Sequence, residues 1–286
     1  MVANVFIHGG RIGDAIYALY AVKKLGGGIF QQCLRHAPLR WNPELLEACL
    51  KLVRFQSYVT EARFVKIPIQ YVMDHGQHIY QKFSFEKNSF LKYGDEVIPW
   101  THSFIDSESQ NDPYNYPDLN GKNWLHYAHQ ARRHCQYFNL KWNPDDSWLE
   151  WPAKTKSVDI VFHAPSYRLV RPKRDWECIL KFLMKKFNVV ILAGHEDKHE
   201  WMNVCDVTVA DDFLDVSKYL SSAYCFLGCA SSIYAIAEGM KQYRFVELAD
   251  DCFNNYPYGK SGRLVNEWSN EEIIGHVEAF VLQRRQ

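Results

Sequence analysis

Short apolar runs alternate with amphipathic segments along most of the chain, which is the pattern of parallel α/β sheets. In the first half, the pattern predicts strands near 3–8 and 28–34 and helices near 14–25 and 43–53. The second half repeats the alternation more regularly, which predicts two α/β domains, each built on a parallel sheet. The expected strands of the second half lie near 158–163, 189–193, 206–209, 224–227 and 244–248, and its expected helices near 175–187, 197–203, 213–222, 231–240 and 270–283.

The alternation breaks down in the middle of the chain. Residues 71–127 are rich in Tyr, His, Asn and Pro and show no regular period, which predicts surface loops around a site. A helical pattern returns near 124–138, and a Pro-containing turn at 151–154 indicates a linker. We therefore expect two domains, residues 1–150 and residues 151–286.

Composition narrows the class of protein. The chain has 286 residues and no net formal charge, with 47% hydrophobic and 23% charged residues, as in soluble globular proteins. Zero net charge argues against a protein held to nucleic acid or membrane by bulk electrostatics. No apolar run approaches the roughly 20 residues of a membrane span, the N-terminus lacks a signal-peptide pattern, and the eight cysteines include no Cys-x-x-Cys pair. We expect a cytoplasmic protein with reduced thiols.

A glycine-rich turn follows the first predicted strand and carries the most informative residues of the chain. The segment from His8 to Asp14 reads His-Gly-Gly-Arg-Ile-Gly-Asp and leads into a helical pattern. Glycines allow close backbone approach, and the start of a helix offers free N–H groups and a positive dipole end. Asp14 is either the cap of this helix or a base facing a cleft at the carboxyl end of the first strand, with His8 and Arg11 beside it.

The motifs of three familiar classes of site are missing. A dinucleotide fingerprint needs a glycine at the position of His8 and an acidic end to the second strand, which reads Phe-Gln-Gln-Cys at 30–33. The Gly-Lys-Ser at 259–261 lacks the earlier glycine of a phosphate-binding P-loop, because Asn254 stands there. The twelve histidines show no metal-ligand spacing. We therefore expect neither an NAD enzyme, nor a P-loop NTPase, nor a metal site.

Four segments of the chain carry a family pattern: 13–19 (GDAIYAL), 163–168 (HAPSYR) with 173–176 (KRDW), 192–196 (LAGHE) and 227–239 (LGCASSIYAIAEG). Together they resemble the heptosyltransferase-like glycosyltransferases, and most closely their compact members carried by phages and environmental genomes. The resemblance implies the GT-B fold, in which two Rossmann-like domains face each other across a cleft. The nucleotide sugar then binds the C-terminal domain and the acceptor the N-terminal one, and the terminal helix is able to pack back on the first domain.

The resemblance implies an enzyme that transfers a sugar from a nucleoside-diphosphate sugar to a hydroxyl, usually without a metal and, we expect, with inversion. Cations and helix N-termini must then carry the charge of the departing diphosphate. Asp14 is the expected base, His8 its rival, and Arg11 lies on the same turn. The expected donor-binding residues are Gly13, Ser166, Arg168, Lys173, Arg174, Ser231 and Ser232 around the diphosphate and Glu196 at the ribose, with Glu238 as the alternative ribose contact.

Two departures from the family pattern bear on the substrate. Cys229 stands where Asp is usual and Tyr234 where His is usual, so the donor sugar is not assigned as heptose. The acceptor is either a cell-surface oligosaccharide or, for a phage-type enzyme engaged in DNA modification, a hydroxymethylated pyrimidine in DNA. The aromatic residues of the middle third would suit stacking of a flipped base.

Two other functions remain open at this point. A nucleotide-sugar epimerase shares the GT-B fold and would need several acid or base groups around the donor, for which His163, His195 and Glu196 are available. A non-catalytic protein that binds nucleotide sugars would account for the changes at Cys229 and Tyr234.

Overall fold

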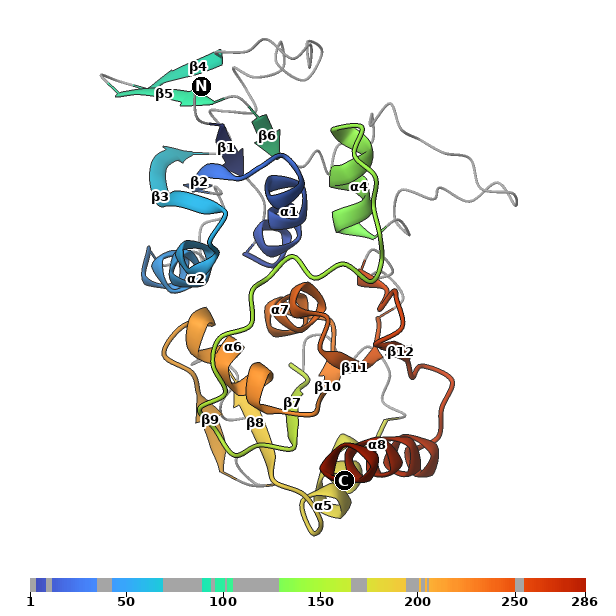
Figure 1. Ribbon diagram of the computed structural model, residues 1–286. Coiled ribbons are helices and arrows are strands. Elements are labelled where there is room, and N and C mark those ends of the chain that lie inside the picture. Colours follow the sequence, from blue (N-terminus) through green and yellow to red (C-terminus); the bar gives the residue numbers. More distant parts are fainter. Residues whose placement is uncertain are drawn as a thin grey trace.

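Two parallel sheets occupy the two halves of the molecule, with helices packed between them (Figure 1). The computed structural model describes residues 4–8, 12–34, 43–68, 89–93, 96–100, 102–104, 129–165, 174–193, 201, 204, 206–249 and 255–286.

The first sheet has the strand order β3-β2-β1-β6, and all neighbouring strands are parallel. Helix α1 connects β1 to β2, helix α2 connects β2 to β3, and helix α4 packs on α1. The predicted strand at 28–34 is confirmed to the residue. The elements are β1 (Val5–His8), α1 (Ile12–Lys24), β2 (Gly28–Leu34), α2 (Pro43–Phe55), β3 (Val59–Pro68), β6 (His102–Phe104) and α4 (Gln130–Tyr137).

The second sheet has the order β12-β11-β10-β7-β8-β9, again with parallel neighbours. Counted along the chain this is the 3-2-1-4-5-6 order of a doubly wound Rossmann sheet, so the order reverses between β7 and β10. Ligands of such sheets bind outside the carboxyl ends of the strands at this point. The elements are β7 (Ile160–His163), α5 (Trp176–Leu183), β8 (Val189–Ala193), β9 (Val207–Val209), α6 (Phe213–Ser222), β10 (Cys225–Cys229), α7 (Ser232–Met240), β11 (Tyr243–Glu247), β12 (Gly262–Leu264) and α8 (Asn270–Arg285).

Several strands were not predicted from the sequence. The irregular middle segment was expected to form loops, but it contains the antiparallel hairpin of β4 (Ser89–Tyr93) and β5 (Glu96–Trp100) as well as β6. The sheet was expected to end at the strand near 244–248, but β12 pairs beyond it. Strand β3 was also missed, because its apolar positions do not alternate strictly. The helix expected near 124–138 is confirmed as α4 from Gln130 to Tyr137, and its first residues, 124–128, lie outside the described residues. All residues of the helix expected near 197–203 except Trp201 also lie outside them.

The two sheets share one hydrophobic core. Helices α1 and α2 of the first half pack on α7 and α6 of the second (Figure 1). The apolar side chains between them, such as Ile16 and Ile236, form one buried cluster that reaches into both sheets. A second cluster lies on the other face of the second sheet, under α5 and α8.

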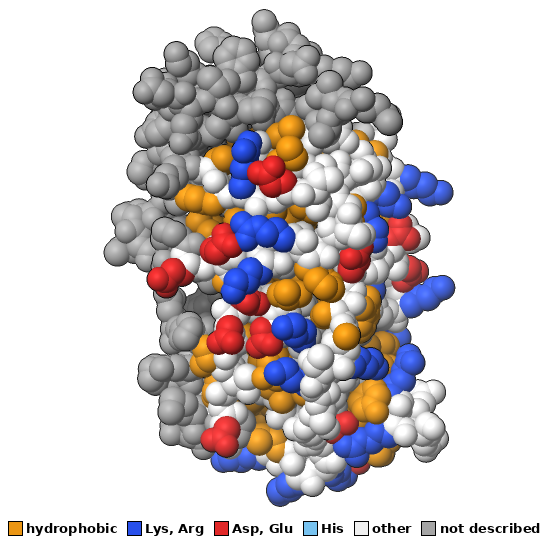
Figure 2. Space-filling model, turned by 60° about the vertical axis from the view of Figure 1, so that its left-hand side comes forward, with side chains coloured by type: hydrophobic (Ala, Val, Ile, Leu, Met, Phe, Trp, Pro, Cys, Tyr) orange, Lys and Arg blue, Asp and Glu red, His pale blue; other side chains and the backbone are white. Residues whose placement is uncertain are grey.

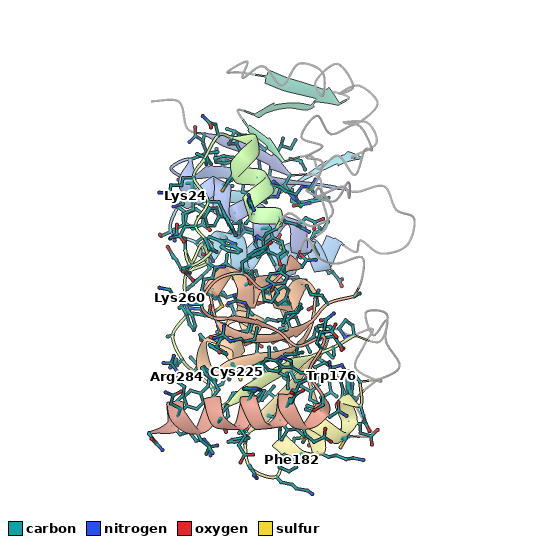
Figure 3. All side chains as sticks on the ribbon, turned by 90° about the vertical axis from the view of Figure 1, so that its right-hand side faces the viewer. Lys24, Trp176, Phe182, Cys225, Lys260 and Arg284 are labelled. Atoms are coloured by element: carbon teal, nitrogen blue, oxygen red, sulfur yellow. The ribbon has the colours of Figure 1, made fainter. Side chains whose placement is uncertain are left out.

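Within the described residues, the terminal helix packs on the second domain and not back on the first. Helix α8 packs on α5, and its buried side chains Ile273, Val277 and Val281 belong to the core of the second sheet. Figure 3 shows α8, which carries Arg284, at the end of the molecule that also holds Phe182 of α5. The expectation that this helix packs back on the first domain is therefore corrected: its contacts are with the second.

The charges of the surface are mixed. Figure 2 shows basic and acidic side chains interspersed over the described part of the face that carries α2 and α6. Lys51 of α2 binds Asp212, the cap of α6, at 2.9 Å. Such mixing agrees with the zero net charge of the chain.

Candidate active site

The N-terminal ends of α1 and α7 lie against each other. A Cβ atom placed on Gly13 would be 3.8 Å from the Cα of Ser232, which is ordinary van der Waals contact. Gly13 therefore brings the start of α1 in the first domain to the first residue of α7 in the second. Each helix start offers free N–H groups and the positive end of a dipole. Their meeting favours the binding of an anion here.

The start of α7 is held in place by its own cap and by a glycine in the preceding strand. The side chain of Ser231 accepts a hydrogen bond from the backbone N–H of Tyr234 at 3.1 Å, and its hydroxyl proton remains available for donation. Gly228 has a φ of 151°, and a Cβ atom there would overlap the backbone oxygen of His163. Strands β10 and β7 thus approach closely where the strand order reverses.

Asp14 lies inside the first turn of α1. The helix begins at Ile12, two residues earlier than predicted, so Asp14 is its third residue and not its cap. The capping interpretation is therefore wrong. A carboxylate in the first turn is favourable next to the helix dipole. The side chain is partly exposed and lies at the same end of α1 as Gly13. A substrate could therefore reach the carboxylate, and its role as a base is taken up below as a proposal.

His8, the rival base, is buried at the end of β1. Its Nδ1 lies 2.9 Å from Oε1 of Gln32 on β2, and this amide oxygen can only accept a hydrogen bond, so Nδ1 is the donor. Burial lowers the pKa of His8 to about 4, although the hydrogen bond to Gln32 opposes the shift. Such an imidazole is neutral at pH 7 and a weak base. Its geometry favours a structural role in joining β1 and β2.

Arg174 was expected to hold the diphosphate, but the structure uses it elsewhere. Its Nε donates to Glu247 at 3.0 Å, and its two Nη atoms donate to the backbone oxygens of Trp268 at 2.6 Å and Val265 at 2.8 Å. The side chain is 6% exposed. Most of its hydrogen-bonding capacity is thus spent on fixing the end of β11 and the segment after β12. This arrangement does not fit a cation waiting for a ligand.

The structure brings together Gly13, Ser231 and Ser232 among the predicted residues, with Asp14 on the same turn of α1 as Gly13. The remaining predicted site residues lie outside the described residues: Arg11, Ser166, Arg168, Lys173, His195 and Glu196.

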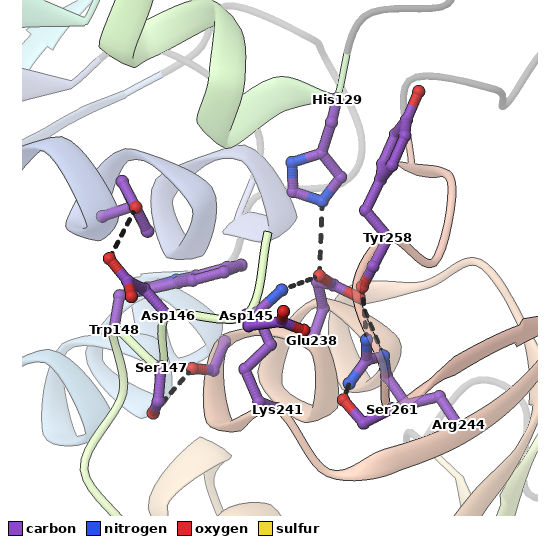
Figure 4. Close-up of polar contacts among 12 residues, drawn as sticks. His129, Asp145, Asp146, Ser147, Trp148, Glu238, Lys241, Arg244, Tyr258 and Ser261 are labelled. Atoms are coloured by element: carbon purple, nitrogen blue, oxygen red, sulfur yellow. Dashed lines mark hydrogen bonds and ion pairs between the residues drawn. The ribbon is translucent and has the colours of Figure 1, made fainter. Parts of the chain in front are cut away.

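A buried cluster of charges under α7 was not predicted (Figure 4). Glu238 of α7 and Arg244 of β11 have fully buried side chains, with Nε of Arg244 2.8 Å from Oε2 of Glu238. Lys241 also binds the Glu238 carboxylate, and the hydroxyl of Tyr234 lies 3.1 Å from it. His129, which precedes α4 in the first domain, places Nε2 at 3.5 Å from Oε1 of Glu238.

The charge states of this cluster follow from burial and from the two cations. Burial alone would raise the pKa of Glu238, but Arg244 and Lys241 outweigh it and hold the pKa well below the usual range. Burial lowers the pKa of His129 against the opposing effect of Glu238, so the imidazole is neutral at pH 7. The Glu238 carboxylate already contacts Arg244, Lys241, Tyr234 and His129, and it has no exposed surface. It is therefore not placed to contact the ribose of a donor, the alternative role considered for it.

Part of this cluster was accessible from the sequence. Glu238 lies in the helix predicted near 231–240, and Lys241 follows directly after that helix, three residues from Glu238, a spacing that brings side chains together at a helix end. Arg244 follows on the next strand and His129 is more than a hundred residues away, so their contacts depend on the tertiary fold.

A hollow of about 440 Å³ lies at the other end of α1. It is therefore not the candidate active site, which lies at the N-terminal end of this helix. Its lining residues are Tyr20, Lys23, Lys24, Asp146, Ser147 and Trp148.

The described residues contain no group of three or more His, Cys, Asp or Glu side chains placed to hold a metal ion. None of the described helices is both long enough and apolar enough to cross a bilayer.

Known structures resemble this fold over its whole length. E. coli ADP-heptose lps heptosyltransferase II matches with a TM-score of 0.59 and 12% identity, covering 99% of this chain and 100% of that one. A family 9 glycosyl transferase from Veillonella parvula matches with a TM-score of 0.57 and 10% identity, covering 98% of this chain and 97% of that one. E. coli heptosyltransferase WaaC with ADP-2-deoxy-2-fluoro heptose matches with a TM-score of 0.56 and 11% identity, covering 96% of this chain and 99% of that one.

No protein-family model matches the sequence, and a search of curated protein sequences gives no match. The likeness is thus one of fold, and it confirms the GT-B architecture expected from the sequence.

Proposed function

We propose that this chain is a glycosyltransferase that moves a sugar from a nucleoside-diphosphate sugar to an acceptor hydroxyl. The observation that carries the proposal is the contact between Gly13 and Ser232. It brings a partly exposed carboxylate-bearing turn of one Rossmann-like domain to the start of α7, at the ligand-binding edge of the other. A base and an anion site at a domain boundary are what sugar transfer from a diphosphate requires.

The donor's diphosphate binds at the N-terminal end of α7. The free N–H groups of its first turn and the hydroxyls of Ser231 and Ser232 donate hydrogen bonds to phosphate oxygens. The departing group gains charge as its bond to the sugar breaks, and donors fixed in place stabilise that charge without reorganisation. Gly13, Ser166, Arg168 and Lys173 are proposed to complete the diphosphate site, with Glu196 at the ribose.

Asp14 acts as the base. The acceptor oxygen attacks the anomeric carbon, Asp14 takes the hydroxyl proton, and the bond to the diphosphate oxygen breaks with its electron pair on the leaving group. A single displacement of this kind inverts the anomeric centre. The charge is carried by helix ends and cations of the chain, with no metal or other cofactor in the proposed scheme.

The proposed acceptor hydroxyl belongs to an oligosaccharide or to a hydroxymethylated pyrimidine in DNA, as in a phage-encoded enzyme. Both offer an alcohol to Asp14. They differ in charge, and DNA binding would fall steeply with added salt while glycan binding would not. Once the donor is known, both acceptors should be offered side by side at two salt concentrations and the products weighed by mass spectrometry.

The epimerase alternative loses part of its support. Nδ1 of His163 donates to the backbone oxygen of Leu192 at 2.7 Å, and the side chain is 6% exposed. This histidine is therefore engaged in joining β7 to β8. The other two groups that the alternative needs, His195 and Glu196, lie outside the described residues.

A thermal-shift screen with nucleoside diphosphates and their sugars tests the proposal. Saturation at about 100 times the dissociation constant adds about 2.7 kcal/mol to the free energy of unfolding. We expect a selective rise in melting temperature with one nucleotide. Ser232→Asp should abolish the shift because it puts a negative charge at the anion site. Ser157→Asp, on an exposed residue ahead of β7, should keep it. No shift with any nucleotide contradicts the donor site.

A further inference from the structure

Trp148, in the linker before the second sheet, is wedged between the two domains. Its indole Nε1 donates to the backbone oxygen of Ile16 on α1 at 2.8 Å. Its backbone N–H donates to the oxygen of Gly239 on α7 at 2.9 Å. The side chain is fully buried. One residue thus joins the helix that carries Asp14 to the helix that begins at Ser232.

Gly239 allows this close approach. A Cβ atom there would lie 2.7 Å from Cγ of Leu149 and 2.9 Å from Nε1 of Trp148, closer than real Cβ contacts. Its backbone oxygen accepts a second hydrogen bond, from the N–H of Leu149 at 3.0 Å. The linker therefore packs directly on the backbone of α7.

The linker is also tied to the first domain beyond α1. The hydroxyl of Tyr58 donates to the backbone oxygen of Trp148 at 2.7 Å, and the N–H of Glu150 donates to the side chain of Gln56 at 2.7 Å. The N-terminal ends of the same two helices meet at Gly13 and Ser232. Helices α1 and α7 are thus connected at their N-terminal ends and again along their length.

The apolar packing around Trp148 is continuous with the core. Domains within a chain usually meet through modest, polar surfaces and move relative to each other, unless the interface is large and hydrophobic. Here the buried cluster runs from one sheet to the other through α1 and α7. Separating the two domains at this interface would expose apolar area and would also move His129 away from the buried Glu238.

We propose that Trp148 is a positioning residue that fixes the separation of Asp14 from the start of α7, so that the two sheets form one rigid body before any substrate binds. The catalytic part of this inference rests on the proposed function, but the rigid-body part does not. Displacement needs base, acceptor and donor in line, and a misplacement of about 1 Å costs roughly 100-fold in rate. A fixed wedge between the helices supplies that alignment.

The first test measures a distance between the domains. Spin labels attached by non-thiol chemistry at the exposed residues Thr60 on β3 and Glu271 on α8 report the separation of the two sheets. We expect one narrow distance distribution for the otherwise unchanged protein. Trp148→Phe, which loses the indole N–H, should broaden it. The matched control Trp151→Phe, at a 46% exposed tryptophan of the same linker, should leave it narrow.

Tyr58→Phe is the milder second variant, because it removes the hydrogen bond to the Trp148 oxygen and keeps the ring. It should broaden the distribution less than Trp148→Phe does. A broad or two-peaked distribution in the otherwise unchanged protein overturns the rigid body. A Trp148→Phe distribution as narrow as that of the Trp151→Phe control overturns the role of Trp148.

The second test separates positioning from mere stability. With the donor found by the nucleotide screen, Trp148→Phe should lower kcat about 10- to 100-fold and leave the donor's dissociation constant within twofold, because most of the proposed donor contacts lie on the second domain. If kcat and the affinity for the donor fall together, in proportion to the unfolded fraction, Trp148 has a structural role only. If the unchanged protein transfers no sugar, the proposed function fails, while the distance measurement still decides the rigid body.

Discussion

Nε of Arg244 lies 2.8 Å from Oε2 of Glu238, and neither side chain reaches solvent. The pair joins β11 to α7, and the hydroxyl of Tyr234 extends it to the backbone oxygen of Asn255 at 2.7 Å. Helix α7, which is proposed to bind the donor, is therefore held to the second sheet by buried ionised groups. Such groups are stable in the interior only while each keeps its partner.

Removing the carboxylate of Glu238 should destabilise the protein strongly. Glu238→Gln leaves the buried Arg244 without its counterion and removes the ion-pair partner of Lys241, and breaking a buried pair in this way costs about 3–5 kcal/mol. Urea unfolding followed by tryptophan fluorescence measures the change. Glu271→Gln, on an exposed glutamate of α8, is the control and should change stability by less than about 0.5 kcal/mol. Equal midpoints for the two variants would refute the account of the cluster.

Stability should fall as the pH is lowered from 7 to 5. Burial lowers the pKa of His8 to about 4, whereas an unfolded histidine titrates near 6.5. The unfolded state therefore binds the proton first, and the loss begins as the pH passes below about 6.5. Taking His8 alone, it amounts to about 2 kcal/mol between pH 7 and pH 5.

His8→Asn is the variant that isolates this share, because asparagine keeps a donor for Gln32 and does not titrate in this range. The stability difference between pH 7 and pH 5 should shrink by about 2 kcal/mol in this variant. A pH profile identical to that of the unchanged protein would show that His8 is not the buried neutral group described above. His129, whose pKa is also lowered by burial, should keep a residual slope of the same sign.

Arg174→Ala should lower stability and spare nucleotide affinity. The variant loses the bonds to Glu247, Val265 and Trp268, each of the kind worth about 1.5–3 kcal/mol when one partner is charged. Calorimetric titration with the nucleoside diphosphate found by the screen, at a temperature where the variant is folded, measures the affinity. A tenfold loss of affinity with unchanged melting temperature would restore Arg174 to the diphosphate site.

Gly228→Ala should prevent folding of the second sheet. Its φ of 151° is open to glycine, and a methyl group would overlap the backbone oxygen of His163. The matched control is Gly275→Ala in α8, where a Cβ atom has no neighbour within 4 Å. Alanine is about 1 kcal/mol better than glycine inside a helix, so this control should be slightly stabilised. Soluble, fully folded Gly228→Ala protein would contradict the close approach of β10 and β7.

The sequence was most informative where structure is local. The strand from Gly28 to Leu34 and the helix from Phe213 to Ser222 were predicted to the residue, because apolar period and flanking turns define them. Strands β6 and β12 were missed because their three residues each, His-Ser-Phe and Gly-Arg-Leu, show no apolar alternation, unlike the equally short Val-Thr-Val of β9. Such strands leave almost no pattern of their own.

The site shows the same division. Gly13 and Ser232 were both predicted from local motifs, and the fold brings them into contact. Arg174 was misassigned because a cation before a helix looks the same whether it faces a ligand or a neighbouring loop. Its partners lie about 70 to 95 residues further along the chain, which is a relationship that only the tertiary structure reveals.

Asp14→Asn tests the central claim most directly, by sugar transfer and donor binding measured on the same protein. The carboxylate is proposed to act on the acceptor's proton, so the variant should lose transfer by at least about 100-fold, as for loss of a general base. The donor's dissociation constant, measured by calorimetry, should stay within about threefold, because the diphosphate binds at α7. Transfer at the rate of the unchanged protein would contradict the account, since the carboxylate would then have no part in the chemistry.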